Sequence, residues 1–304
     1  MIDLTMVIKM KKQLTGVAFL AVAVLIWGST FVAQSVGMDK VGPFTFQAVR
    51  CALAVLFLLP VIALFEIRDI KNYFRKWLDK KLWLAGILCG LALFIAASLQ
   101  QVSLVDTDAG KAGFLTALYI VLVPVIGFFL GRRLSLPTII SIVLAVIGLY
   151  LLSCVGVTTI RTGDLLLLGC ALAFAVQITL IDRLGKDVDG LRLNCIQCLV
   201  VTILSTIFMF GTEAPNLPDI LACWLPIGYA GILSMGVAYS LQVLGQQRLE
   251  PTAASLIMSL ESVVAAITGW LILNESMTGA ELLGSCLLFT AVILSQIPTK
   301  IKRQ

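Results

Sequence analysis

The sequence predicts an all-α transmembrane fold of ten helices in two inverted five-helix repeats. Three observations predict it. Hydrophobic residues make up 60% of the 304 residues and charged residues only 13%, with a mean hydropathy of +1.03. The apolar residues gather in ten long runs, and the two halves of the chain resemble each other. A soluble domain is nearer one quarter charged, so these few charges are too few to cover a water-facing surface.

Each of the ten runs is about 20 residues long, which is the length of helix that crosses a bilayer. They lie at 14–36, 43–65, 82–104, 109–131, 136–155, 163–182, 190–210, 222–245, 252–273 and 279–298. The apolar stretch that begins at Leu14 is too long for a signal peptide, so we expect a retained first helix. Apolar residues recur at helical spacing in the connection 66–81, with Lys and Arg between them, which predicts an amphipathic helix on the inner membrane surface.

Positive charge predicts the orientation of the helices, because short cytoplasmic loops are enriched in Lys and Arg. With ten spans and the N-terminus inside, 18 of the 22 Lys and Arg residues fall on the cytoplasmic side. Only Lys40 and Arg161 fall outside, while Arg50 and Lys111 lie within spans. We therefore expect a multi-pass plasma-membrane protein with both termini, 1–13 and 299–304, in the cytoplasm.

The two predicted repeats cover 14–155 and 163–298. An offset of 143 residues aligns Leu118 with Glu261 and Arg132 with Glu275, within similar apolar surroundings. Five spans per repeat is an odd number, so the second repeat must enter the membrane in the opposite sense. Inverted repeats of this kind are typical of secondary transporters.

Several classes of function are excluded by missing residues. Histidine is absent, which removes the commonest general base and the commonest zinc ligand. The chain contains no Gly-x-x-x-x-Gly-Lys-Ser/Thr loop for ATP and no acidic cluster for a metal. We therefore expect neither an enzyme nor a cofactor, and no nucleic-acid partner.

Two segments resemble a known family. The sequence Trp27-Gly28-Ser29-Thr30-Phe31 in the first span is similar to the opening motif of EamA-type transporters in the drug/metabolite transporter superfamily. Residues 261–275 resemble that family's Glu-Pro segment, with Ser262 in place of the usual Pro. The resemblance implies a transporter, often an exporter, of small metabolites such as amino acids, with a central cavity lined by spans one, three, four, six, eight and nine.

Glu261 is the most informative single residue, because it is an acid well inside a span. It lies nine residues from Thr252, about 14 Å into the membrane at the helical rise. An unpaired carboxylate there costs at least about 2.5–3.5 kcal/mol. The sequence leaves two readings open: a substrate or proton site, or a structural hydrogen bond to a neighbouring helix.

Two basic residues share this ambiguity. Arg50 is seven residues into the second span, where it would bind a carboxylate substrate, pair with Glu261 or extend outward to the membrane surface. Lys111 is two residues inside the fourth span, where it would anchor the helix at the outer surface or line the outer mouth of a cavity.

Uncharged polar residues complete the candidate site. Each of them would either line the cavity or join neighbouring helices by hydrogen bonds. Trp27 and Tyr119 also suit ordinary packing. The set comprises Trp27, Ser29, Thr30, Gln100, Gln101, Tyr119, Gln177, Tyr239 and Gln242.

We expect a secondary-active transporter, and an exporter by the family resemblance, of small organic solutes such as amino acids or drugs. Proton coupling through Glu261 and a homodimer both stay open. A channel-like passive facilitator shares the same signals. A membrane-embedded enzyme acting on lipid is a third option, and the absence of histidine counts against it.

Overall fold

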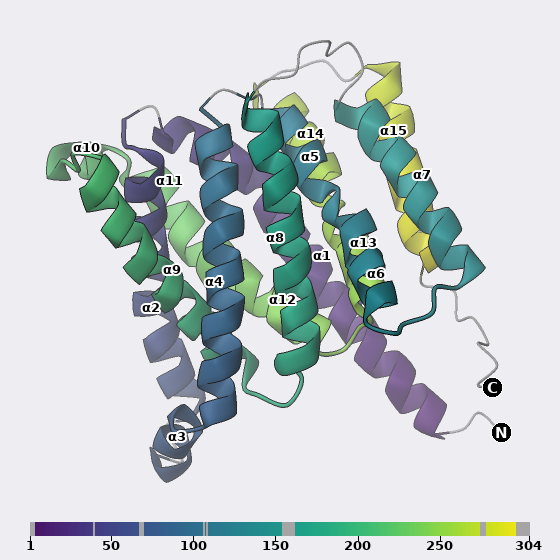
Figure 1. The fold of residues 1–304 in the computed structure, drawn as a ribbon, viewed down its shortest axis with the longest axis horizontal. Helices are drawn as coiled ribbons and strands as arrows, with labels where there is room; N and C mark the ends of the chain where they lie inside the picture. The colour runs from purple at the N-terminus through teal and green to yellow at the C-terminus, as the bar shows by residue number, and fades with distance from the viewer. Residues whose placement is uncertain are drawn as a thin grey trace.

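The structure, a computed structural model, describes residues 4–38, 40–66, 70–105, 107, 109–153, 162–273 and 278–295. These residues form helices and connections, and no strand occurs among them. Figure 1 shows a bundle with α2, α4 and α9 at one end of its long axis and α7 beside α15 at the other. The predicted all-helical fold is confirmed.

The helices coincide with the predicted runs. In chain order they are α1 (Leu4–Met38), α2 (Pro43–Phe65), α3 (Ile70–Trp77), α4 (Lys80–Ser103), α5 (Ala109–Ala117), α6 (Tyr119–Phe129), α7 (Leu136–Ser153), α8 (Thr162–Leu184), α9 (Gly190–Thr212), α10 (Leu217–Ala222), α11 (Trp224–Gly228), the π-helix η1 (Tyr229–Ala238), α12 (Tyr239–Gln246), α13 (Pro251–Met258), α14 (Glu261–Leu273) and α15 (Gly279–Ser295).

Within the described residues, eight helices are long and apolar enough to cross a bilayer. Two further apolar helices, Leu136–Leu152 and Gly279–Ser295, are shorter. The ends predicted for these two, at 154–155 and 296–298, lie outside the described residues. The exposed side chains of the bundle include many large apolar ones, such as Leu56, Phe129 and Ile293, as expected of a surface that faces lipid.

Three of the predicted spans are interrupted. The fourth breaks at Leu118, between α5 and α6, and the ninth breaks at residues 259–260, between α13 and α14. The eighth changes into the π-helix η1 shortly after Pro226. Pro124 lies inside α6, six residues after the break at Leu118. Tyr119 and Glu261 are therefore the first residues of the two half-helices α6 and α14.

The contacts that helices of the first half make with the second half match those that the corresponding helices of the second half make with the first. Helix α2 packs against α9, and α7 packs against α15. Helix α4 packs against α8 and α9, while η1 packs correspondingly against α1 and α2. The broken pair α13 and α14 contacts α1, as the broken pair α5 and α6 contacts α8. By their contacts α1, α2, α4, α5, α6 and α7 thus correspond to α8, α9, η1, α13, α14 and α15.

Helices α2 and α9 are antiparallel and are joined at both ends by a glutamate. At one end the carboxylate of Glu213, after α9, accepts hydrogen bonds from the backbone N–H groups of Phe44 and Thr45, each at 2.8 Å. It thereby satisfies free donors at the start of α2. At the other end Glu66, after α2, pairs with Arg192 near the start of α9 at 2.5 Å. This hydrogen bond lowers the pKa of Glu66 below its usual value.

The connection between α2 and α4 contains the short helix α3, which confirms the helix predicted in segment 66–81. The ring centroids of Tyr73 and Trp77 in this helix each lie 5.3 Å from the guanidinium carbon of the buried Arg192. The side chain of Phe74 is exposed. Part of the aromatic face of α3 therefore covers Arg192. We call the side of the bundle with α3, the start of α1, the end of α8 and the start of α13 the α3 end (Figure 1).

The crossing between α7 and α15 depends on glycine. A Cβ atom built on Gly284 would lie 2.5 Å from the backbone oxygen of Gly148, and one on Gly148 would lie 2.7 Å from the oxygen of Gly284. Close approach of this kind gives membrane helices their van der Waals contact.

We therefore predict that Gly284→Ala destabilises the protein, because the two backbones must separate at a cost of about 1–3 kcal/mol. Gly211→Ala is the matched control, since a Cβ atom on Gly211 meets nothing within 4 Å. Thermal unfolding of the purified protein in detergent measures both variants. Equal unfolding temperatures for the two would contradict the role of this crossing.

Candidate functional site

A cavity of about 50 Å³ lies inside the bundle, lined from both halves of the chain. Its walls come from α1, α2, α4, α5, α6, α8, η1, α12, α13 and α14. The lining residues are Trp27, Thr30, Phe31, Gln34, Arg50, Gln100, Thr116, Tyr119, Phe174, Ile178, Ser234, Met235, Tyr239, Gln242, Met258 and Glu261. Polar and charged groups share this space with aromatic rings.

The centre of the cavity lies where the two interrupted helices meet. The hydroxyl of Tyr119, the first residue of α6, donates to Oε1 of Glu261, the first residue of α14, at 3.3 Å. A carboxylate at the N-terminal end of a helix is favoured by the helix dipole. The breaks at Leu118 and at 259–260 thus bring these two side chains together inside the bundle.

The π-helix supplies another part of the wall. Ser234 and Met235 of η1 line the cavity, and the side-chain amide of Asn194 donates to the Met235 carbonyl oxygen at 2.9 Å. Gly231 packs against the backbone of Arg50, where a Cβ atom would lie 2.7 Å from the Arg50 oxygen. Wider helical turns of this kind occur frequently at functional sites.

Eight of the predicted site residues line the cavity: Trp27, Thr30, Arg50, Gln100, Tyr119, Tyr239, Gln242 and Glu261. Trp27 and Tyr239 meet edge to face, with ring centroids 5.0 Å apart. Arg50 is only 3% exposed, so it does not extend outward to the membrane surface. In the described part of the chain no ion pair joins Arg50 to Glu261; Nη1 of Arg50 instead donates to Oε1 of Gln34 at 2.9 Å.

Three of the other predicted residues, Ser29, Gln101 and Gln177, lie outside the cavity lining. Ser29 shares a hydrogen bond of 2.5 Å with the hydroxyl of Tyr229. Gln177 accepts from Gln242 at 3.2 Å and donates to Gln197 at 3.0 Å, so it joins three helices behind the cavity wall. Gln101 is buried outside the lining, and Lys111 belongs to α5 with a side chain outside what the structure describes.

Sequence reasoning did not single out several lining residues: Phe31, Gln34, Thr116, Phe174, Ile178, Ser234, Met235 and Met258. For Gln34 a signal was present. It follows Trp27 by seven residues and Thr30 by four, which places all three on one face of a helix. Of the adjacent pair Gln100 and Gln101, Gln100 lines the cavity.

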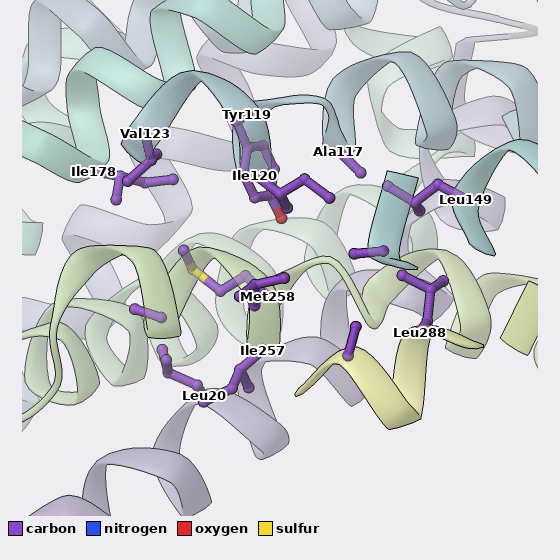
Figure 2. Close-up of a cluster of buried hydrophobic side chains, with 14 of the residues drawn as sticks. Leu20, Ala117, Tyr119, Ile120, Val123, Leu149, Ile178, Ile257, Met258 and Leu288 are labelled. Atoms are coloured by element: carbon purple, nitrogen blue, oxygen red, sulfur yellow. The ribbon is translucent and has the colours of Figure 1, made fainter. Parts of the chain in front are cut away.

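The cavity is closed toward the α3 end by a hydrophobic cluster. Met258 and Ile178 belong both to the cavity wall and to this cluster, which continues through Val123 and Ile257 to Leu20. Figure 2 shows these five side chains packed together. All of them are at most 2% exposed.

An ion cluster also lies at the α3 end and joins the two halves of the chain. Arg132, after α6, donates to the carboxylates of Asp182 in α8 and Glu250 before α13. Lys186 also pairs with Asp182, at 2.7 Å. Asp182 is only 3% exposed, so its two cationic partners compensate for the cost of burying its charge.

A polar cavity inside a bundle of apolar helices, closed at one end, is the architecture of a membrane transporter. The sequence profile of the EamA-like transporter family matches this chain twice, over residues 14–154 and 161–296. The chain therefore belongs to the EamA-like transporter family and is a multi-pass membrane transporter.

Individual relatives agree with this family. A protein of Archaeoglobus fulgidus named an uncharacterized transporter is 31% identical over 93% of this chain and 86% of its own length. The uncharacterized transporter YoaV of Bacillus subtilis is 23% identical over 89% and 93%. The threonine/homoserine exporter RhtA of Salmonella typhimurium is 28% identical over 47% of this chain and 48% of its own length. A protein of known crystal structure shares the fold, with a TM-score of 0.77 at 18% identity over 94% of this chain and 96% of that one.

We predict that a cysteine on the cavity wall reacts with a small hydrophilic methanethiosulfonate, because thiol reactivity follows exposure to water. Ser234→Cys lines the cavity, whereas Ser205→Cys is a matched control that is buried away from it. The measurement is labelling followed by mass spectrometry in a Cys154→Ser/Cys286→Ser background, since the other native cysteines are buried. Equal labelling at both positions would count against a hydrated cavity.

Proposed function

We propose that this chain is a secondary-active exporter of small organic solutes, such as amino acids or drugs, across the plasma membrane. The observation that carries this proposal is the cavity, which holds the buried charges Arg50 and Glu261 without an ion pair between them in the described structure. A buried charge is costly in a membrane and marks substrate or ion pathways. The similarity to RhtA, a threonine/homoserine exporter, supports an amino-acid substrate.

The transporter consists, in this proposal, of ten spans in two inverted repeats, 14–155 and 163–298. Three findings support this organisation: the exchange of helix contacts between the halves, the two matches to the family profile, and the breaks at Leu118 and 259–260. Interrupted helices at corresponding positions of two repeats are typical of transporter binding sites.

The α3 end faces the cytoplasm in this proposal, with both termini on that side. Lys76, Lys80 and Lys81 lie there, together with Arg132 and Arg183. The excess of basic residues supports this orientation. The cavity would then be closed toward the cytoplasm, and transport would require the hydrophobic cluster and the ion cluster to open.

Glu261 is, in this proposal, the proton-coupling residue. Its carboxylate is 7% exposed, borders the cavity and accepts a hydrogen bond from Tyr119. A carboxylate so buried gains from binding either a proton or a positively charged substrate group, so its charge state would change during the cycle.

We predict that Glu261→Gln reduces transport to background, because an amide keeps the shape and the hydrogen bond but does not exchange a proton. Glu281→Gln is the matched control. Glu281 is in the first turn of α15, where it forms a capping box with Thr278 that glutamine also supports. Uptake into proteoliposomes across a pH gradient measures both variants. Transport by Glu261→Gln at the wild-type rate and with the wild-type pH dependence would refute the coupling role.

Counterflow separates a carrier from a passive channel in the same proteoliposomes. Solute on the opposite side accelerates a carrier, because the loaded carrier returns faster than the empty one. A channel shows no such acceleration.

The ion cluster would act as the cytoplasmic gate, since Arg132 joins the first half of the chain to Asp182 of the second. Asp182→Asn is expected to weaken this closure, because the buried charged pair is lost. Glu250→Gln is the matched control: the side chain of Glu250 pairs with the same arginine but is 76% exposed, and exposed pairs contribute little.

The test uses labelling of Ile257→Cys in the hydrophobic cluster, in the same cysteine background. Asp182→Asn should increase labelling from the α3 end, and Glu250→Gln should leave it unchanged. Unchanged labelling in Asp182→Asn would show that the ion cluster does not close the pathway.

A further inference from the structure

The cationic guanidinium of Arg50 lies in the part of the cavity that is farthest from the α3 end. Its guanidinium is held in place by Gln34, whose Oε1 accepts from Nη1 at 2.9 Å, and by the ring of Phe46, 5.5 Å from the guanidinium carbon. Among the described residues no carboxylate lies within 4.0 Å of it. Arg50 therefore carries a buried charge that these neighbours orient but do not neutralise.

Two hydrogen-bond donors beside this charge have no acceptor. Nε of Arg50 and Nε2 of Gln34 are both buried, and neither has a partner in the described structure. Both residues are at most 5% exposed and line the cavity. The amide of Gln34 is oriented by its bond to Arg50, because the oxygen must face the guanidinium. Its NH₂ group is thus left unpaired, and a buried unpaired donor costs about 1–3 kcal/mol.

A cation with adjacent free donors is complementary to a carboxylate. The planar guanidinium matches the two oxygens of a carboxylate better than a point charge does. We propose that Arg50 and Gln34 form a carboxylate-binding subsite, so that the solute carried by this transporter bears a carboxylate group. This inference rests on the proposed transport function and narrows its substrate class.

Glu261 does not compete for this subsite, because it lies at a different depth. Helices α1 and α14 run in the same direction, and a Cβ atom on Gly28 would touch Val264. Glu261 precedes Val264 by three residues, while Gln34 follows Gly28 by six. Nine residues at the helical rise separate the two levels by roughly 13 Å. The solute carboxylate at Arg50 therefore leaves Glu261 free for its own role.

The experiment compares pairs of probes that differ only in the carboxylate. Purified full-length protein is screened by thermal shift with the L-amino acids and with small monocarboxylates such as lactate. Each ligand that binds is then compared with its methyl ester and its primary amide. The acid should bind at least about tenfold more tightly than either derivative, as expected for losing hydrogen bonds to a charged group.

Gln34→Glu is the sharpest variant. It keeps the size of the side chain and places a carboxylate next to Arg50, so the protein supplies its own anion. We expect binding of the acid probes to fall at least about tenfold while the unfolding temperature is maintained or rises. A merely structural Arg50 would tolerate this variant. Gln246→Glu is the matched control and should leave acid binding unchanged, because it adds the same charge at a buried position outside the cavity lining.

Arg50→Gln is the third variant. If it does not fold, Arg50→Lys replaces it, because lysine retains the positive charge. Arg50→Gln should abolish the preference for acid over amide, which loss of stability alone would not do. Unchanged acid preference in Gln34→Glu, or binding of esters and amines in place of acids by the wild type, would overturn the subsite. Failure of the transport proposal is distinct: it would appear as ligand binding without uptake or counterflow.

Discussion

The structure depends on one constraint, which is that hydrocarbon offers no hydrogen bonds. Every polar group in an apolar span must find its partner within the protein. The chain meets this constraint in several places by linking helices through side chains. Glu213 caps the start of α2, Asn194 bonds the backbone of η1, and Gln177 joins Gln242 to Gln197. These bonds fix the relative positions of helices that apolar contact alone would leave free to slide, because lipid competes equally well for apolar surfaces.

Against this background, unpaired polar atoms become informative. Trp27, Gln34, Arg50 and Gln242 each contribute a cavity-lining side chain with a buried atom that lacks a partner among the described residues. They come from three helices, α1, α2 and α12, which belong to both halves of the chain, so no single local distortion explains them. Buried polar groups cost free energy when they have no hydrogen-bond partner. Bound solute or water supplies such partners and lowers that cost. The polar groups that the fold leaves unsatisfied are thus those available for binding.

The sequence predicted what depends on local pattern and missed what depends on three-dimensional contact. Hydropathy located the spans, and the isolated acid and base within apolar runs pointed to Glu261 and Arg50. The partner of Arg50 was not predictable, because an arginine in a span pairs equally well with a carboxylate or an amide on any neighbouring helix, and Gln34 lies 16 residues away. The π-helix and the break at Leu118 also escaped prediction.

The same helices carry side chains of the cavity wall and of the hydrophobic cluster that closes the α3 end. Met258 ends α13 and belongs to both the cavity wall and the hydrophobic cluster, and Glu261 begins α14 only three residues later. A movement of this break that changes the surroundings of Glu261 must therefore also move a side chain of the closing cluster. Ile178 in α8 stands in the same double position, one turn before Asp182 of the ion cluster. In the proposed transport cycle, binding in the cavity and opening of the α3 end would be linked through two short stretches of helix, one in α8 and one at the break before Glu261. Rigid packing on either side of these stretches makes the link a mechanical one, since a close-packed interior transmits small displacements instead of absorbing them.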